Sequence, residues 1–326
     1  MIASLNRKAR GHNCIFKLDM MKAFDRVSWW FLRQLLCKFG FDYRFILLIL
    51  NNLSHSWFFV LVNGRARGFF QASRGIKQGD PLSPLLFILA SEALSRGLNA
   101  QVADGSVAPY ATLRGCVRVI HLSFTDDIII FAHGDRRSVG NLIRFLTLYQ
   151  TTAGQRVNTH KSLFIISRRC GTSQIRRIQQ MTGFRHGSLP LSYLGCHLYA
   201  GRRKKVYFQF LIDKFIAKLA GWQKKLLSQG GRLILIKHVL SAIPTHVLAV
   251  MDLPSRVLKD LERIMVNFFW GPTELGPKHH WCSSKTYATQ WRRMALAYDP
   301  LKIYKGRSVA NCGGGIAIRP SYGPIL

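Results

Sequence analysis

Three aspartates stand at the ends of strand-like segments, where carboxylates can gather around divalent cations. Asp19 follows the strand-like run 14–18, and Asp126 and Asp127 lie at the tip of a predicted hairpin further along the chain. If the strand and the hairpin pair in one sheet, the carboxylates converge. Two or three carboxylates can hold two Mg²⁺ ions about 3.5–4 Å apart, which is the arrangement used for in-line displacement at phosphorus.

Each of these pieces also has a plainer interpretation. A hairpin tip with two Asp is commonly a solvated turn, and Asp19 could simply cap the residues that follow it. The stretch 75–84, which contains GIKQGDP, could be an ordinary connection rich in Gly and Pro. The order and spacing of the three stretches together favour a site with chemistry over three unrelated turns.

The charge balance predicts a polyanionic partner. The 326 residues contain 47 Lys and Arg against 15 Asp and Glu, a formal net charge of +32. Phosphates relieve self-repulsion on this scale, because their contacts with Lys and Arg release condensed counterions. A ribosomal-type structural protein and an anionic membrane surface are the alternatives on charge alone. Since acids are scarce, a cluster of Asp is informative, and binding of a divalent cation explains it.

Cysteine usage and the first residues predict an intracellular protein, nuclear or cytoplasmic, without choosing between the two. Seven Cys at wide spacing, with no C-x-x-C, argue against a disulfide framework. No apolar signal segment follows the early basic residues. The uncharged stretch 45–64 is broken by polar residues at 51–56, so it predicts a helix, a turn and a strand. We therefore expect no membrane partner.

The strands and helices that must position the aspartates are predicted to form an α+β layer. Asn63-Gly64 is a hairpin signal, and Ser83-Pro84 is a typical helix start. We expect strands at 14–18, 57–63, 67–73, 117–124, 128–132 and 163–167, and helices at 29–39, 43–53, 83–98 and 138–153.

The second half of the chain changes in character after about residue 173. Apolar residues at helical spacing, with Lys and Arg between them, predict helices at 206–228, 230–242 and 255–270. The tail is poorly patterned. We therefore expect three parts, 1–172, 173–271 and 272–326.

Together the motifs resemble the reverse transcriptases of plant LINE-type (non-LTR) retrotransposons. The family's F-x-L-D-x-x-x-A-F-D, G-x-x-Q-G-D-P-L-S-P and aromatic-Ala-Asp-Asp motifs have the counterparts FKLDMMKAFD, GIKQGDPLSP and FTDD here, in that order. N-x-x-K-S at 158–162, YLG at 193–195 and NFFWG at 267–271 also match. The resemblance covers about residues 4–271. It implies a right-hand polymerase palm, with an antiparallel sheet and packed helices, followed by a basic helical thumb-like domain.

The resemblance also implies roles for individual residues. Asp19 and Asp126 would ligate two Mg²⁺ ions, or Mn²⁺, and Asp127 would support them. Lys161 would stand near the phosphates as a general acid, unless it is one more basic surface residue. Phe24 would exclude a 2′-hydroxyl unless it is a core aromatic, and Gln78 and Gly79 would line the nucleotide pocket. The primer would be gripped by Tyr193, Leu194 and Gly195. We expect the nucleic-acid backbone to be contacted by Lys224, Lys225 and Arg232.

The sequence departs from the family pattern in several places. Thr125 replaces the usual Ala before the Asp pair. The part of the fingers that precedes the first motif is nearly absent from this sequence, as are endonuclease and ribonuclease H domains, so we expect weak primer extension by this chain alone. GGGIAIR at 313–319 resembles the family's C-terminal zinc-binding-type segment. The spacing of His279, His280, Cys282 and Cys312 nevertheless fits no closed zinc site, so we expect no zinc.

The function implied is that of an RNA-directed DNA polymerase domain, which extends a DNA primer on an RNA template with dNTPs. The alternative is a catalytically inactive retroelement remnant that only binds nucleic acid, and it shares the same fold. A group II intron-type maturase would use the same palm, but the YLG and NFFWG features point away from it. No protein partner can be inferred from the sequence.

Overall fold

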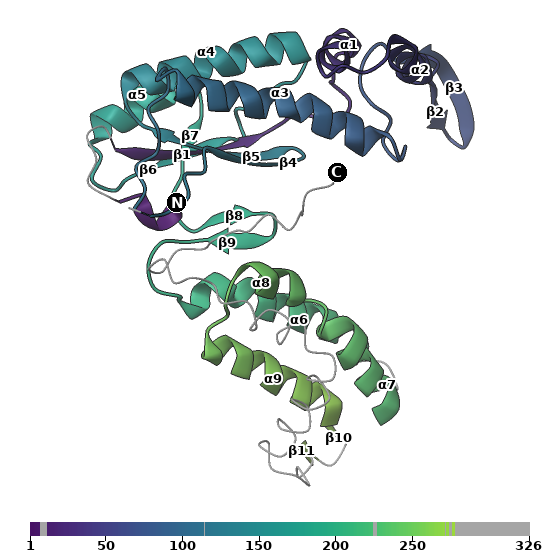
Figure 1. Cartoon of the computed structure of the whole chain (residues 1–326). Coiled ribbons are helices and arrows are strands. Elements are labelled where there is room, and N and C mark those ends of the chain that lie inside the picture. The colour runs from purple at the N-terminus through teal and green to yellow at the C-terminus, as the bar shows by residue number, and fades with distance from the viewer. Residues whose placement is uncertain (7–11, 114, 224–226, 271, 274–275, 278–326) are drawn as a thin grey trace. The chain divides into compact units, whose positions relative to one another are not determined.

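The computed structural model describes residues 1–6, 12–113, 115–223, 227–270, 272–273 and 276–277 (Figure 1). Contacts divide the chain into two compact units, Met1–Leu189 and Pro190–Leu326. The sequence placed a boundary after residue 172. The observed division comes later because α5 (Thr172–Thr182) packs on α4 (Arg136–Ala153), and because β7 (Arg185–His186) pairs with β6 (Leu163–Ile166).

The first unit is built on a five-stranded sheet with the order β4-β5-β1-β6-β7. The central strand β1 (Asn13–Asp19) pairs antiparallel with β5 (Asp127–His133) and with β6. The short strand β4 (His121–Phe124) pairs antiparallel with β5, and β7 runs parallel to β6. The predicted α+β fold with a mainly antiparallel sheet is confirmed.

The two faces of the sheet have different surroundings. Side chains alternate along a strand, and Cys14, Phe16 and Leu18 of β1 enter the core that α3 (Ser83–Ala103), α4 and α5 close (Figure 1). Lys17 and Asp19 therefore point to the opposite face. The face away from the helices carries the buried Ile15 together with the charged Lys17 and Asp19.

The chain between β1 and α3 forms two helices and a hairpin. Ser28 accepts a hydrogen bond from the Phe31 amide and caps the first of these helices, as its position predicted. The hairpin turns at Asn63 and Gly64, which both have positive φ as a type I′ turn requires. The elements are α1 (Trp29–Lys38), α2 (Tyr43–Ser54), β2 (Trp57–Val62) and β3 (Arg65–Gln71), and the short helix η1 (Ile2–Ser4) opens the chain.

Several elements differ from the expectations. Ser83 is the first residue of α3 and its buried hydroxyl has no partner among the described residues, so it is not the cap. The segment 117–120 lies outside β4. The helix expected from 138 begins at Arg136 because Asp135 accepts a hydrogen bond from the Ser138 amide. α5 and β7 were not predicted.

The second unit is mostly helical, as expected. A hairpin of β8 (Leu191–Tyr193) and β9 (Cys196–Leu198) precedes a core that includes Phe208, Phe215 and Val257. The other elements are η2 (Lys205–Phe208), α6 (Gln209–Gln223), α7 (Gln229–Leu235), the π-helical turn η3 (Ile236–Leu240), α8 (Thr245–Val250), α9 (Ser255–Trp270), β10 (Pro272–Thr273) and β11 (Gly276–Pro277).

One stretch, Gln229–Val250, is long and apolar enough to cross a membrane by length and composition alone. Its residues Ile236, Leu240 and Val247 are buried in the core of the second unit. These three residues pack within this unit, and 17% of the apolar window is buried. The absence of a membrane partner stays a prediction.

Candidate active site

Asp19 and Asp127 face each other across the two central strands of the sheet. They are register partners in the antiparallel pair β1–β5, and paired residues share a face of the sheet. The Met20 amide donates to the Asp126 carbonyl at 2.8 Å, which fixes Asp126 beside the end of β1. The pairing brings together aspartates that 107 positions (126 − 19) separate in the sequence.

A polar group lies close to each of the three carboxylates. Lys17 Nζ lies 3.3 Å from Asp127 Oδ1, and Lys161 Nζ lies 3.9 Å from Asp19 Oδ2. Thr125 Oγ1 donates to Asp126 Oδ1 at 2.8 Å. The Asp126 side chain is exposed and the other two are partly exposed, so all three can be reached from solvent.

The N-x-x-K-S motif forms a turn that is attached to the backbone of Asp19 on both sides. The Asn158 amide donates to the Asp19 carbonyl at 2.8 Å, and the Asp19 amide donates to Ser162 Oγ at 3.2 Å. Asn158 Oδ1 accepts from the amides of His160 and Lys161 and so closes the turn. This geometry places the exposed Lys161 side chain next to the Asp19 carboxylate.

The turn between β4 and β5 holds Thr125 in an unusual conformation. Thr125 has φ of 48°, in the left-handed region that β-branched residues avoid. With Phe124 and Asp127 paired on either side, Thr125 and Asp126 make a two-residue loop. Such loops need positive φ, so the tight hairpin imposes the conformation.

The donors of this site suit a hard cation. Carboxylate oxygens are the protein ligands that Mg²⁺ prefers, usually one or two with water and substrate phosphate completing the shell. The register of Asp19 with Asp127, and the neighbouring position of Asp126, supply such donors at one end of the sheet. In the described parts of the chain, no group of three or more His, Cys, Asp or Glu is arranged to hold a metal ion.

A second loop is fastened to the segment that follows Asp19. Gln78 Nε2 donates to Asp25 Oδ1 at 2.9 Å. The Gly75 amide donates to the Val27 carbonyl at 2.8 Å and the Ile76 amide to the Phe24 carbonyl at 2.9 Å. The predicted nucleotide residues of the two motifs are thus neighbours. Gly79 follows with φ of 89° and no heavy atom within 4 Å of a Cβ built on it.

Gly75 is required at the point where this loop approaches the first motif. Its φ is 89°, and a Cβ there would lie 2.7 Å from the Asp25 carbonyl oxygen. Trp29 Nε1 donates to the Gly75 carbonyl at 2.6 Å. Phe24 is partly buried, and its ring stacks on Phe87 of α3 with centroids 4.6 Å apart and planes at 9°. The loop and the Phe24 ring are therefore both held in place.

The comparison with protein families decides what this arrangement is. The family described as "Reverse transcriptase (RNA-dependent DNA polymerase)" matches residues 2–198. The chain belongs to the reverse transcriptase family. The confirmed α+β fold, with the three motifs meeting at one end of the sheet, is the palm of this reverse transcriptase domain.

Relatives of the reverse transcriptase domain come from mobile elements. The "Retrovirus-related Pol polyprotein from type-1 retrotransposable element R2" of Popillia japonica is 29% identical over 154 residues, which is 47% of this chain and 24% of the relative. "Transposon TX1 uncharacterized 149 kDa protein" of Xenopus laevis is 24% identical over 273 residues, 82% of this chain and 20% of the relative. The non-LTR kind of element predicted by the motifs is confirmed, and the plant type stays a prediction.

A solved structure also matches the chain. Telomerase of Candida Tropicalis in complex with a fragment of telomeric RNA matches with a TM-score of 0.43 and 13% identity, over 90% of this chain and 48% of that one. The reverse transcriptase domain spans about a fifth to a quarter of the length of the curated relatives named above.

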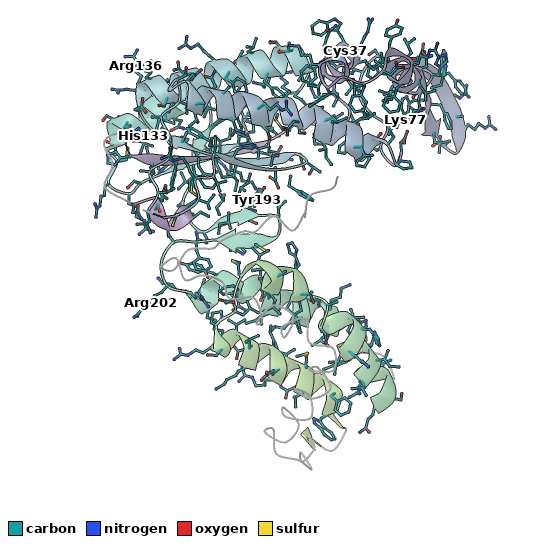
Figure 2. All side chains as sticks on the ribbon, viewed as in Figure 1. Cys37, Lys77, His133, Arg136, Tyr193 and Arg202 are labelled. Carbon is teal, nitrogen blue, oxygen red and sulfur yellow. The ribbon has the colours of Figure 1, made fainter. Side chains whose placement is uncertain are left out.

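The YLG segment of the reverse transcriptase domain is a tight hairpin in the second unit (Tyr193 is labelled in Figure 2). Leu194 and Gly195 both have positive φ, as a type I′ turn requires. His246 Nε2 lies 2.7 Å from the Leu194 carbonyl oxygen and ties the turn to α8. The role of Tyr193, Leu194 and Gly195 as a primer grip stays a prediction.

The predicted backbone contacts of the second unit have different outcomes. Arg232 Nη1 donates to the carbonyls of Phe268 at 3.3 Å and Phe269 at 3.5 Å, and its guanidinium lies 6.0 Å from the Phe268 ring centroid. Arg232 thus holds the C-terminal end of α9, a structural role that the sequence did not predict. Lys224 and Lys225 lie outside the described residues, as do the four tail residues weighed as zinc ligands.

Sequence reasoning missed several residues that support the site. Lys17 could have been found, because a residue two positions before Asp19 on a strand shares its face. The hydrogen bond between Asp25 and Gln78 and the stacking of Phe87 on Phe24 join residues far apart in the sequence. No local sequence pattern predicts such contacts.

Proposed function

We propose that this reverse transcriptase domain is an RNA-directed DNA polymerase that extends a DNA primer on an RNA template by two-metal nucleotidyl transfer. The observation that carries the proposal is the register of Asp19 with Asp127, with Asp126 fixed at the adjacent turn. These three carboxylates at one open end of the sheet would supply oxygen ligands for divalent cations in a chain that otherwise has few acids.

Asp19 and Asp126 would hold the ions, Mg²⁺ or Mn²⁺, and Asp127 would support them. Such ions neutralise charge on the reacting phosphate and align the attacking and leaving oxygens. Lys17, at 3.3 Å from Asp127, balances the charge of this third carboxylate. It therefore favours Asp127 as a supporting group rather than a principal ligand.

Lys161 is suited to proton transfer at the leaving group. In the reaction, the primer 3′ oxygen bonds to the α-phosphorus of the dNTP, and the bond from that phosphorus to the bridging oxygen breaks. The proton of the 3′-hydroxyl goes to solvent, and the Lys161 ammonium gives a proton to the departing pyrophosphate. The support is geometric, because Lys161 lies 3.9 Å from Asp19 and its side chain is 70% exposed, so it can swing to a phosphate.

Phe24, Gln78 and Gly79 would form the nucleotide pocket. The stacked Phe87 prevents the Phe24 ring from turning away, so its bulk can act against a 2′-hydroxyl. Asp25 holds the Gln78 amide in one orientation. The bare backbone at Gly79 leaves room for a base or sugar to approach closely.

Template and primer would be held through their phosphates, consistent with the formal net charge of +32. This predicts binding that depends little on sequence and falls steeply with salt. The other candidate function, nucleic-acid binding without catalysis, predicts the same salt dependence, so only a catalytic measurement separates the two.

The test is primer extension with purified protein on a poly(A)–oligo(dT) template, with Mg²⁺ or Mn²⁺. It is run with the chain alone and with the chain fused to the segment that precedes the first motif in a complete relative. Extension by either protein with dTTP, and much less with UTP, supports the proposal. Duplex binding without extension by both proteins would favour the non-catalytic function.

A further inference from the structure

The first unit carries an arginine surface at the end of the sheet opposite to the aspartates. From Arg136 to Leu189 the sequence has nine Arg and one Lys, and no Asp or Glu. Six of these arginines cluster on two helices and a turn, and all six are exposed. The arginine surface consists of Arg136 and Arg137 on α4, Arg168 and Arg169 in the turn after β6, and Arg176 and Arg177 on α5.

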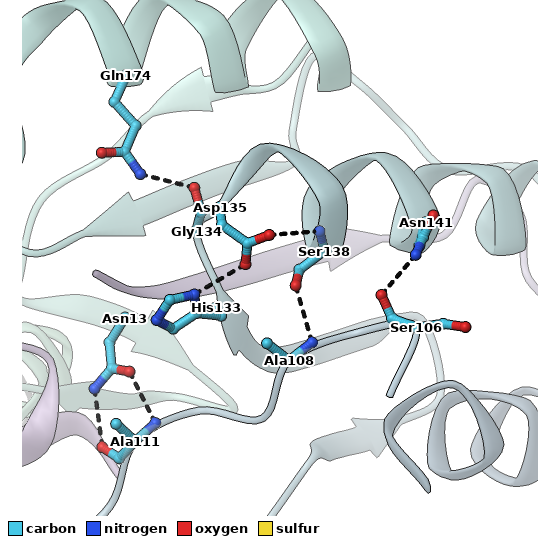
Figure 3. Close-up of polar contacts among 10 residues, drawn as sticks. All are labelled: Asn13, Ser106, Ala108, Ala111, His133, Gly134, Asp135, Ser138, Asn141 and Gln174. Atoms are coloured by element: carbon cyan, nitrogen blue, oxygen red, sulfur yellow. Dashed lines mark hydrogen bonds and ion pairs between the residues drawn. The ribbon is translucent and has the colours of Figure 1, made fainter. Parts of the chain in front are cut away.

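Helix packing brings the two helical parts of this surface side by side. Gln174 Nε2 of α5 donates to the Gly134 carbonyl, just before α4, at 2.8 Å (Figure 3). A Cβ at Gly140 of α4 would lie 3.5 Å from the Met181 methyl of α5. The two helices therefore run parallel and in step, which sets their arginines at the same level. Figure 2 shows Arg136 at this end of α4, beside α5.

The frame beneath the arginine surface is well fixed. Asp135, the nearest acid in the sequence, accepts from the Ser138 amide at 2.9 Å and lies 2.9 Å from His133 Nδ1 (Figure 3). Burial raises the pKa of this carboxyl, but hydrogen bonds from Ser138 and His133 outweigh it and lower the pKa below its usual range. The Asp135 carboxylate thus interacts with Ser138 and His133 at the start of α4. None of the six arginines forms an ion pair with a described residue.

The position of the arginine surface separates it from the catalytic end. The turn with Arg168 and Arg169 begins at Ser167, whose amide donates to the Asn13 carbonyl at 3.3 Å. Asn13 is the first residue of β1 and Asp19 is the last. Six strand residues rise about 20 Å. The arginine surface therefore lies about 20 Å from Asp19, at the other end of β1.

The chemistry of the arginine surface favours the backbone of a double helix. Guanidinium groups bind phosphate through paired hydrogen bonds. Single strands are usually bound with aromatic side chains on which bases stack, and membranes with apolar side chains that insert. Between residues 133 and 182 the structure describes one exposed large hydrophobic side chain, Leu148, about three turns along α4 from Arg136. The surface offers charge without stacking or insertion.

We propose that the arginine surface binds the phosphate backbone of a second, double-helical segment of nucleic acid, while the catalytic end holds the primer–template. The proposal does not depend on catalysis, because it is tested by binding alone.

The test uses the full chain and two variants of equal charge. The surface variant carries Arg168→Gln, Arg169→Gln, Arg176→Gln and Arg177→Gln. The control variant carries Arg33→Gln, Arg44→Gln, Arg65→Gln and Arg67→Gln, four exposed arginines of the segment between β1 and α3. Each protein is first saturated with an unlabelled primer–template. A fluorescent blunt RNA hairpin is then added, and its anisotropy is followed as KCl is raised.

We expect the wild type and the control variant to bind the hairpin in addition to the primer–template. The surface variant should lose this second binding, and its slope of log affinity against log salt should fall by about 3 to 4, since each phosphate contact contributes about 0.9. Equal loss in both variants would show bulk charge alone and overturn the proposal. Displacement of the primer–template by the hairpin in the wild type would show one shared site and also overturn it.

Two further measurements keep the outcome unambiguous. Thermal unfolding and circular dichroism compare the folding of the variants, and the smaller change Arg176→Gln with Arg177→Gln should give a partial loss of hairpin binding. Co-sedimentation with phosphatidylserine vesicles tests the other anionic surface. If the surface variant loses vesicle binding and keeps hairpin binding, the partner is a lipid surface and the proposal is wrong.

Discussion

Asp25 accepts a hydrogen bond from the side-chain amide of Gln78, with 2.9 Å between Oδ1 and Nε2. This contact joins the two motifs that we assign to the nucleotide pocket. Because the Gln78 amide nitrogen faces Asp25, the amide oxygen of Gln78 is free to face the pocket. If Gln78 lines the nucleotide pocket as we propose, Asp25 would act on the nucleotide through Gln78, as a positioning residue.

Replacing Asp25 tests this relationship. We expect Asp25→Ala to raise KM for dNTP roughly two- to tenfold, the value of one hydrogen bond of about 0.5–1.5 kcal/mol, with a smaller effect on kcat. Asp25→Asn keeps an acceptor oxygen and should remain close to the wild type. Steady-state primer extension measures both constants. If Asn is as harmful as Ala, the role of Asp25 is not to accept from Gln78.

Thr125 offers a second test, because its hydroxyl occupies an oxygen of Asp126 and its φ of 48° is unfavourable for a β-branched residue. Thr125→Ala removes both features, whereas Thr125→Val removes the hydroxyl alone. We expect both changes to lower the Mg²⁺ concentration for half-maximal extension, roughly two- to tenfold, since an oxygen is freed. An increase for both variants would mean that the hydroxyl orients Asp126 for the metal.

Arg232 should contribute to the stability of the second unit. Its Nη1 bonds to the Phe268 and Phe269 carbonyls at the end of α9, where a cation is favourable. We expect Arg232→Ala to lower Tm by about 2–4 °C, which corresponds to about 1 kcal/mol. Lys237→Ala, an exposed lysine in the next turn, is the matched control. An unchanged Tm would contradict this structural role, and a flatter salt slope for duplex binding would support the predicted contact with nucleic acid.

His121 makes stability depend on pH. Burial lowers its pKa, against the opposing charge of Glu92, and its ring contacts Ser95 Oγ at 2.7 Å. Because the folded pKa lies below the unfolded value of about 6.5, the unfolded chain binds more protons in acid. Stability should therefore fall as pH decreases through and below about 6.5.

The measurement is the urea midpoint at pH 7.5 and 5.5. His121→Asn should reduce the loss between these values, and His238→Asn, at an exposed position in the second unit, is the matched control. An identical loss in the wild type and in His121→Asn would contradict the assignment.

The sequence predicted turns and helix caps most accurately, because neighbouring residues decide them. The type I′ turn at Asn63 and Gly64 and the cap at Ser28 are local, and both appear where expected. The convergence of Asp19 with Asp127 could be predicted because both lie at the ends of short, mostly apolar runs typical of strands, although the pairing itself rested on family resemblance.

Other features could not be predicted because tertiary contacts decide them. α5 has apolar residues Ile175, Ile178 and Met181 between Arg and Gln, a weak pattern that becomes a helix when it packs on α4 and the core. Arg232 is another example, because its contacts with α9 were not predicted, while its contact with the nucleic-acid backbone stays a prediction. Its partners lie 36 and 37 positions away, and only the folding of α9 against α7 brings them within reach.

The most direct test of the central claim is whether the aspartates hold divalent cations. Electron paramagnetic resonance would count bound Mn²⁺ with primer–template, a primer lacking its 3′-hydroxyl and dTTP, so that no bond forms. We predict two bound ions in the wild type. Asp19→Asn and Asp126→Asn should each weaken binding by about tenfold or more, while Asp104→Asn, an acid in the turn after α3, should not. Equal Mn²⁺ binding by all three variants and the wild type would contradict the two-metal account.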